Sequence, residues 1–237
     1  MFPVLLAVVL AAPNIVVISA DTLRADHLGC YGYPLATSPN IDALAAQSLV
    51  FEDVVCEVPL TAPSFCSMWT SRFPRLIGVT RNGMRLAEEV PLTAEVFDAA
   101  GYFTVCVQSN WTLKAKLSGL ERGFDLYEDD FHQKRWGFIK AERTADEVTN
   151  TAIESLAKWD REQPLFAWIH YSDPHAPYKA HDEFDLHEDQ PRDRSRGAKV
   201  RRGYDSEIAF MDAQMAALLA ALPSEDTFIV FVADHGE

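Results

Sequence analysis

The sequence is poor in positive charge. Of its 237 residues, 21 are Lys or Arg and 35 are Asp or Glu, which gives a net charge of −14. Nucleic-acid binding depends on clustered basic side chains, so this balance excludes a general nucleic-acid partner. The one basic cluster, "RDRSRGAKVRR" at 192–202, stands beside the acidic "HDEFDLHED". We expect a solvated loop there, with contact to an anionic substrate as the alternative.

Cysteines, nucleotide-binding loops and long apolar runs are also scarce. The four cysteines show no C-x-x-C spacing and are too few for a disulfide framework. G-x-G-x-x-G and G-x-x-x-x-G-K-[ST] loops are absent from the sequence. The apolar start, "MFPVLLAVVLAA" at 1–12, is shorter than the roughly 20 residues of a membrane span. It is either an apolar leader strand or a weak, clipped export signal, and we favour export to the periplasm or the exterior.

Apolar runs alternate with helical patterns, which predicts an α/β fold with a mostly parallel sheet. The predicted strands are Ile15 to Ser19, Tyr102 to Gln108, Leu165 to His170 and Thr227 to Ala233. Helices are expected after the Ser38–Pro39 cap, over "TAEVFDAAGY", behind a Thr144/Glu147 capping box, and in the stretch before the last strand. The apolar stripes of the last two helices predict core packing: Val148, Ala152, Leu156 and Trp159 in one, Ile208, Met211, Met215, Leu218 and Leu222 in the other.

Acidic and imidazole groups follow three of the predicted strands. They are Asp21 after the first, His170, Asp173 and His175 after "LFAWI", and Asp234 and His235 after "FIVFVA". Parallel strands would bring these groups to one edge of the sheet, where ligands collect in open α/β folds. Two carboxylates with one imidazole suit a divalent cation, calcium or manganese by their oxygens and zinc by the nitrogen. The alternative is that these residues only form turns and caps.

A candidate nucleophile lies in "VPLTAPSFCSMWTSRFP". Pro63 suits the first turn of a helix, so Thr61 would present its hydroxyl among unpaired N–H groups at that helix's N-terminus. A nearby cation would lower the hydroxyl pKa and activate it for attack. The alternative is that Thr61 merely caps the helix.

Six segments together resemble the sulfatase-like hydrolases of the alkaline phosphatase superfamily, in order and in spacing. They are "ADTLRADHLGCYGY", "SPNIDALAAQSLVFEDV", "TAPSFCSMWTSRFP", "GYFTVCVQSN", "HYSDPHAPY" and "ADHGE", and the resemblance covers the chain from Asn14 to Glu237. The resemblance implies a three-layer α/β/α sandwich with one metal centre that activates a nucleophile. After the apolar leader or weak signal remnant at 1–12, the resemblance implies a catalytic domain over 13–237 whose C-terminal part is missing.

By resemblance, the metal ligands are Asp21, Thr61, Asp234 and His235, and calcium is the expected ion, with manganese and zinc as alternatives. Thr61 is the implied nucleophile, and His175 faces the substrate and protonates the leaving oxygen. Arg72 matches the arginine of the family's T-G-R triplet, with Ser71 in place of glycine, and would support the nucleophile helix.

Several positions depart from the family pattern. Thr61 cannot become formylglycine, as the Cys or Ser of C/S-x-P-x-R does, and the arginine of that pattern is Phe65. Thr22 replaces the second aspartate of the usual pair as a weaker, neutral ligand. Asn110 and Thr112 stand where sulfatases carry a substrate-binding lysine and histidine, so Asn110 is the expected substrate contact.

These departures favour the threonine-bearing branch, which is similar to phosphodiesterases, phosphonate-ester hydrolases and phosphoethanolamine-type transferases. We predict metal-dependent hydrolysis of a small anionic sulfate or phosphate-type ester through a covalent threonine intermediate. The alternatives are a truncated, non-catalytic domain and a phosphoethanolamine-type transferase. The sequence does not decide the oligomeric state.

Overall fold

The computed structural model describes residues 12–130, 133–135, 139–187 and 195–237. The predicted leader at 1–12 therefore lies, except for Ala12, outside the described residues. Among the described residues, no helix combines the length and the apolar character that a bilayer crossing requires.

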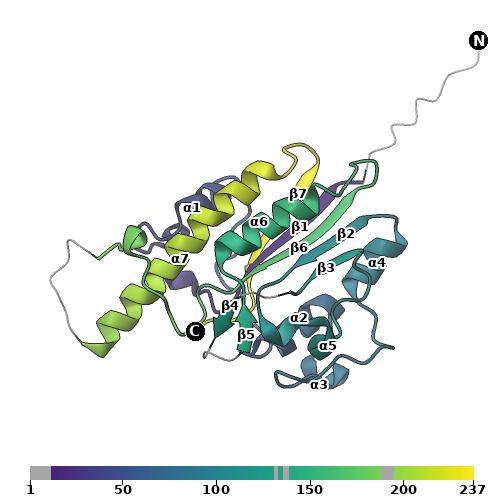
Figure 1. Ribbon diagram of the computed structural model, residues 1–237, viewed down its shortest axis with the longest axis horizontal. Helices are drawn as coiled ribbons and strands as arrows, with labels where there is room; N and C mark the ends of the chain where they lie inside the picture. The colour runs from purple at the N-terminus through teal and green to yellow at the C-terminus, as the bar shows by residue number, and fades with distance from the viewer. Residues whose placement is uncertain (1–11, 131–132, 136–138, 188–194) are drawn as a thin grey trace, which may run out of the picture.

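A five-stranded sheet forms the centre of the fold, in the order β3-β2-β6-β1-β7 (Figure 1). Every neighbouring pair in it is parallel. Two further strands, β4 and β5, form a separate antiparallel pair. The strands are β1 (Asn14–Ala20), β2 (Phe103–Val107), β3 (Leu126–Glu128), β4 (Gln133–Arg135), β5 (Ile139–Glu142), β6 (Leu165–Tyr171) and β7 (Thr227–Ala233).

Helices connect the parallel strands, as parallel pairing demands. The α-helices are α1 (Pro39–Ala45), α2 (Thr61–Thr70), α3 (Pro74–Ile77), α4 (Thr93–Ala99), α5 (Ala115–Ser118), α6 (Ala145–Leu156) and α7 (Arg196–Ala221). Short 3₁₀ turns are η1 (Ala25–His27), η2 (Gly29–Tyr31), η3 (Trp111–Leu113) and η4 (Asp182–Phe184).

The two faces of the sheet bury two separate apolar clusters, which gives the three layers of an α/β/α sandwich. Alternate residues of β1 point to opposite faces, so Val16 and Ile18 pack with residues of α6 and α7, while Val17 packs with residues of α2 and α4. Figure 1 shows α6 and α7 lying over one face and α2, α4 and α5 gathered on the other side. The predicted fold class is confirmed in this respect.

All four predicted strands are present, within one residue at each end. The stripes predicted for α6 and α7 are confirmed, because Val148, Ala152, Ile208, Met211 and Met215 are all fully buried. The sequence did not reveal β3. It has only three residues, all half-buried, and therefore lacks the continuous apolar run that marks β1 and β6.

Helix α1 begins where Ser38 and Pro39 predicted, but Ser38 does not cap it. The Ser38 hydroxyl accepts a hydrogen bond from Gly29 N–H at 2.9 Å and donates to Asp42 at 3.0 Å. The cap comes from α7, where the buried Asp212 carboxylate accepts N–H bonds from Asn40 at 3.0 Å and Ile41 at 2.8 Å. Asp212 thereby anchors α1 to α7.

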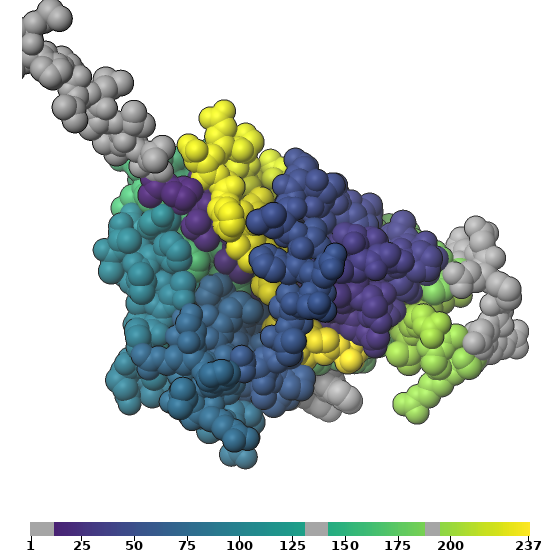
Figure 2. Space-filling model, turned by 180° about the vertical axis from the view of Figure 1, so that it is seen from behind, coloured from purple at the N-terminus to yellow at the C-terminus, as the bar shows by residue number. Residues whose placement is uncertain are grey.

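Strand β7 lies at the edge of the sheet. Most of its side chains are half-buried and Phe228 is 62% exposed, whereas every residue of β6 is buried. Figure 2 shows this yellow segment at the surface, between the purple and teal parts of the chain. The strand that leads to Asp234 and His235 is therefore less buried than β6.

Replacing Asp212 with alanine should lower the free energy of unfolding by about 2–3 kcal/mol, because buried N–H groups of α1 lose a charged acceptor. Urea denaturation at neutral pH measures this. Asp98→Ala, on the exposed surface of α4, is the control and should change stability by less than about 0.5 kcal/mol. Equal effects of the two substitutions would contradict the anchoring role.

Candidate active site

Three parallel strands deliver their polar ends to one edge of the sheet. β1 pairs with β6 on one side and with β7 on the other, so Ala20 lies beside both Tyr171 and Ala233. Asp21 and Asp234 are the residues that follow β1 and β7, and His170 is the last residue but one of β6. The predicted convergence of strand ends is thus present.

Asp173 does not join this group. Its Oδ1 accepts the N–H of Ala145 at 2.9 Å, which places it at the start of α6 on the other side of the sheet edge. Burial, and then the nearby Glu207 carboxylate, raise the pKa of Asp173 to about 8.

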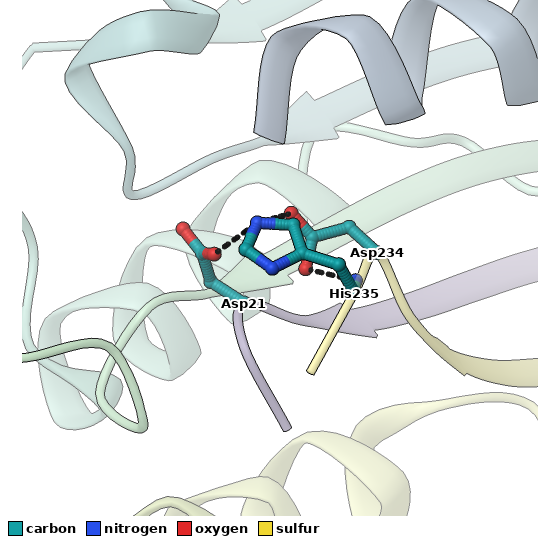
Figure 3. A group of neighbouring side chains, drawn as sticks. All are labelled: Asp21, Asp234 and His235. Atoms are coloured by element: carbon teal, nitrogen blue, oxygen red, sulfur yellow. Dashed lines mark hydrogen bonds and ion pairs between the residues drawn. The ribbon is translucent and has the colours of Figure 1, made fainter. Parts of the chain in front are cut away.

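Asp21, Asp234 and His235 form a compact cluster (Figure 3). One ligand atom from each lies within 4.8 Å of the other two. His235 Nε2 is 3.8 Å from Asp21 Oδ1 and 3.5 Å from Asp234 Oδ2, so the ring nitrogen points between the two carboxylates. The opposite oxygen of Asp234 is held by the N–H groups of Thr22, at 3.1 Å, and of His235, at 2.8 Å.

The electrostatics of this cluster favour a cation. Asp21 and Asp234 are 0% and 1% exposed. Burial, and then the negative charge of Asp21, raise the pKa of Asp234 well above its ordinary value. Asp234 Oδ2 and His235 Nε2 are both buried and make no hydrogen bond. Two carboxylates and an imidazole nitrogen, of which one carboxylate oxygen and the nitrogen have no hydrogen-bond partner, form a ligand set that suits a divalent cation, so the residues fit one.

Thr61 lies next to Asp21 of this cluster. It is the first residue of α2, is 2% exposed, and its hydroxyl donates to Asp21 Oδ1 over 3.4 Å. The N-terminus of a helix carries a partial positive charge, which stabilises an anion there. The structure thus brings together the four residues predicted to bind the metal.

Two contacts that sequence reasoning missed hold the start of α2 in place. Asn82, from a distant turn, accepts the N–H of Ala62 at 2.9 Å, and so caps the helix that Leu60 leaves without a side-chain cap. Ser64 donates from its hydroxyl to the Asp234 carbonyl at 2.7 Å. These bonds tie the start of α2 both to that turn and to the end of β7.

Asn110 contacts Asp21 directly. Its amide nitrogen donates a short hydrogen bond to Asp21 Oδ2, while its oxygen accepts from the Thr112 N–H at 2.9 Å and the Thr112 hydroxyl at 2.8 Å. In this arrangement Asn110 and Thr112 together orient the Asp21 carboxylate. The substrate-binding role of Asn110 stays a prediction.

Phe65, which stands at the position of the family's arginine, makes apolar contacts instead of charged ones. The ring is fully buried and packs on Trp168 at 4.9 Å and edge-on against His170 at 4.8 Å. His170 Nε2 is 3.9 Å from Asp21 Oδ2, and burial lowers the pKa of His170 to about 4, against the opposing pull of Asp21. A neutral imidazole therefore backs the Asp21 carboxylate at neutral pH.

His175 lies on the loop that follows β6 and is half-exposed. Its Nδ1 is 2.7 Å from the Ala176 carbonyl, which makes Nδ1 the proton-bearing nitrogen of that contact.

Arg72, the predicted support residue, lies beyond the end of α2 that is opposite Thr61. It lies two residues beyond the end of α2, whose ten residues extend about 15 Å from Thr61 at 1.5 Å per residue. It lines a hollow of about 350 Å³ whose other wall includes Ser64 and Asp234. The structure does not place Arg72 in the cluster around Asp21, and its support role stays a prediction.

A scan against family models matches the Sulfatase model over residues 13–237. The chain belongs to the sulfatase family. Sulfatases recur among its relatives: it is 28% identical to an ulvan-active sulfatase of Formosa agariphila over 95% of this chain and 50% of that protein. It is 45% identical to human arylsulfatase A, over 39% of this chain and 19% of that protein.

Solved structures show the same fold. Ps i-CgsB, crystallised with k-i-k-neocarrahexaose, matches with a TM-score of 0.78 and 22% identity over 94% of this chain and 58% of that one. The zinc-containing C-terminal periplasmic domain of EcEptC from Escherichia coli matches with a TM-score of 0.74 and 21% identity, over 95% of this chain and 64% of that one. This sulfatase-family chain spans about half the length of the ulvan-active sulfatase.

The carboxylate pair predicts how stability responds to pH and metal. The folded protein holds the Asp234 proton more tightly than the unfolded chain does, so the contribution of Asp234 to metal-free stability falls as the pH rises above about 3.9. Asp234→Asn keeps the acceptor for Thr22 and His235 but carries no charge. It should be more stable than wild type without metal at neutral pH, and thermal denaturation measures this.

Added cation should reverse the order of the two proteins. At 100 times the dissociation constant it stabilises wild type by about 2.7 kcal/mol and gives Asp234→Asn almost nothing. Asp212→Asn, a buried carboxylate that also accepts two backbone N–H groups, is the matched control and should keep the wild-type response. A variant at position 234 that responds like wild type would remove Asp234 from the metal site.

Proposed function

We propose that this chain carries the nucleophile and metal ligands of a hydrolase that cleaves small anionic sulfate or phosphate-type esters. The observation that supports it most is the placement of the Thr61 hydroxyl, 3.4 Å from Asp21 Oδ1, beside the Asp21–Asp234–His235 cluster. Membership of the sulfatase family supports ester hydrolysis in general. The activity of the whole protein belongs to the same proposal.

In the proposed reaction, Thr61 Oγ attacks the sulfur or phosphorus of the ester in line with the leaving oxygen. Its proton passes to Asp21 Oδ1, the acceptor it already faces. The bond to the leaving alcohol breaks as the bond to Thr61 forms. The covalent ester on Thr61 is then hydrolysed by water, which regenerates the hydroxyl.

A divalent cation would be held by Asp21, Asp234, His235 and Thr61. When bound, it would lower the pKa of the Thr61 hydroxyl and neutralise charge on the ester oxygens. Calcium is our first choice because the donor set is rich in carboxylate oxygen, with manganese and zinc as alternatives. Asn110 keeps the Asp21 carboxylate oriented through its amide N–H.

His175 is the proposed general acid. Because Nδ1 is engaged with the Ala176 carbonyl, Nε2 is the nitrogen that would hand its proton to the leaving oxygen. Phe65 supplies no charge in place of the family's arginine, so stabilisation of the developing anion falls on the helix N-terminus and the cation.

A second candidate, transfer of a phosphate-type group to an alcohol, is favoured by one specific feature, the threonine at position 61. It is the residue that keeps a plain hydroxyl where formylglycine sulfatases need Cys or Ser. The fold of this chain also matches that of the EcEptC domain. The same covalent Thr61 ester would form, and an alcohol rather than water would release it.

Thr61→Ala should reduce turnover by about 10³-fold or more, because no other group supplies the attacking oxygen. Nitrophenyl sulfate, phosphate monoester, phosphate diester and phosphonate substrates, each with added calcium, manganese or zinc, measure the loss and identify the ester. Thr70→Ala, whose hydroxyl bonds within the other end of α2, should leave turnover unchanged. Equal turnover by Thr61→Ala and wild type would remove Thr61 from the reaction.

His175→Gln should slow esters of poor leaving groups far more than esters of good ones, since only a poor leaving oxygen needs a proton in the transition state. We expect a loss of about 10²-fold with a phenyl ester and a much smaller loss with a nitrophenyl ester. His181→Gln, whose imidazole bonds to Glu207 on α7, is the control. Equal losses with both esters would assign His175 to binding instead.

A further inference from the structure

Thr22, the residue directly after Asp21, has a left-handed backbone. Its φ is 55°. A β-branched residue at positive φ is an outlier that costs of order 1–3 kcal/mol and persists only where the surroundings enforce it. Thr22 turns the chain at the end of β1, so its conformation sets the path of the chain after Asp21 while its N–H bonds to Asp234.

Three hydrogen bonds from three separate elements hold Thr22. Its N–H donates to Asp234 Oδ1 at 3.1 Å and its hydroxyl donates to the Pro174 carbonyl at 2.9 Å. Its carbonyl accepts from the Tyr204 hydroxyl at 2.8 Å. The Thr22 side chain is thus turned to the loop after β6, and its backbone N–H serves the metal cluster.

Tyr204 makes the third bond from α7. The ring is 4% exposed and its edge packs against His27 at 4.9 Å. The same hydroxyl that donates to Thr22 also accepts the N–H of Arg24 at 2.8 Å, so one oxygen closes the turn from Thr22 to Arg24. Burial raises the pKa of Tyr204, which keeps its proton available for the Thr22 carbonyl.

We propose that Tyr204 is a positioning residue for the metal centre: its hydroxyl fixes the turn from Thr22 to Arg24, keeps Thr22 left-handed and so holds Asp21 opposite Asp234. The inference rests on the proposed function in that it needs a metal at this cluster. Tyr204 acts on the cluster only through the backbone of Thr22. Removing the hydroxyl should let Thr22 relax and move the Asp21 carboxylate out of register.

The test is Tyr204→Phe, which deletes one oxygen from the purified full chain. Calorimetric titration with calcium, manganese and zinc measures affinity, and we expect Tyr204→Phe to lose 10- to 100-fold, as is usual when a partner that orients a metal ligand is removed. Tyr33→Phe is the matched control, because the Tyr33 hydroxyl also bonds to α7, at Asp205 Oδ2 over 2.7 Å. It should change affinity less than twofold.

A rescue separates positioning from a general loss of stability. Glycine adopts positive φ without strain, so Thr22→Gly removes the conformation that Tyr204 has to enforce. In the Thr22→Gly background, adding Tyr204→Phe should cost less than threefold in metal affinity. An undiminished loss there, or equal losses in Tyr204→Phe and Tyr33→Phe, would overturn the inference.

Hydrogen exchange in the metal-free proteins gives a readout that does not need a bound ion. Tyr204→Phe should speed exchange at Thr22 and Arg24 specifically, and Tyr33→Phe should not. If wild type binds none of the three cations, the proposed function fails, and unchanged exchange at Thr22 and Arg24 would overturn the positioning role by itself.

Discussion

Two buried carboxylates that face each other dominate the chemistry of this chain. Asp21 and Asp234 follow neighbouring parallel strands and are buried away from water. In the protein interior their mutual repulsion is little screened. Neighbouring N–H donors offset part of that cost: Asn110 binds Asp21, and Thr22 and His235 bind one oxygen of Asp234. The remaining negative charge accounts for the fit to a cation.

The parallel sheet explains how residues so far apart in sequence meet. Each strand ends at the same edge, so β1, β6 and β7 deliver their following residues to one place. Helices on both faces then fix the details: α2 presents Thr61 from one side, and Tyr204 of α7 holds the turn after Asp21 from the other. The site is therefore assembled from elements that must first pack correctly, which makes its geometry a property of the whole fold.

The sequence predicted the strands and helices that carry strong apolar periodicity, and it predicted the convergence of Asp21, Asp234 and His235. It did not predict what depends on tertiary contact. Ser38 looked like the cap of α1, yet Asp212 from α7 takes that role. Nothing in a threonine signals the positive φ of Thr22, and the turn that places Asn82 at the start of α2 has no periodic pattern to reveal it.

The central claim is that the carboxylate pair is completed by a divalent cation. Calorimetric titration of calcium, manganese and zinc into the metal-free protein, in two buffers of different ionisation enthalpy, tests it most directly. Because Asp234 holds its proton more tightly in the metal-free fold, the account predicts saturable binding of one ion with release of a fraction of a proton, up to one. Absence of saturable binding for all three cations would contradict it.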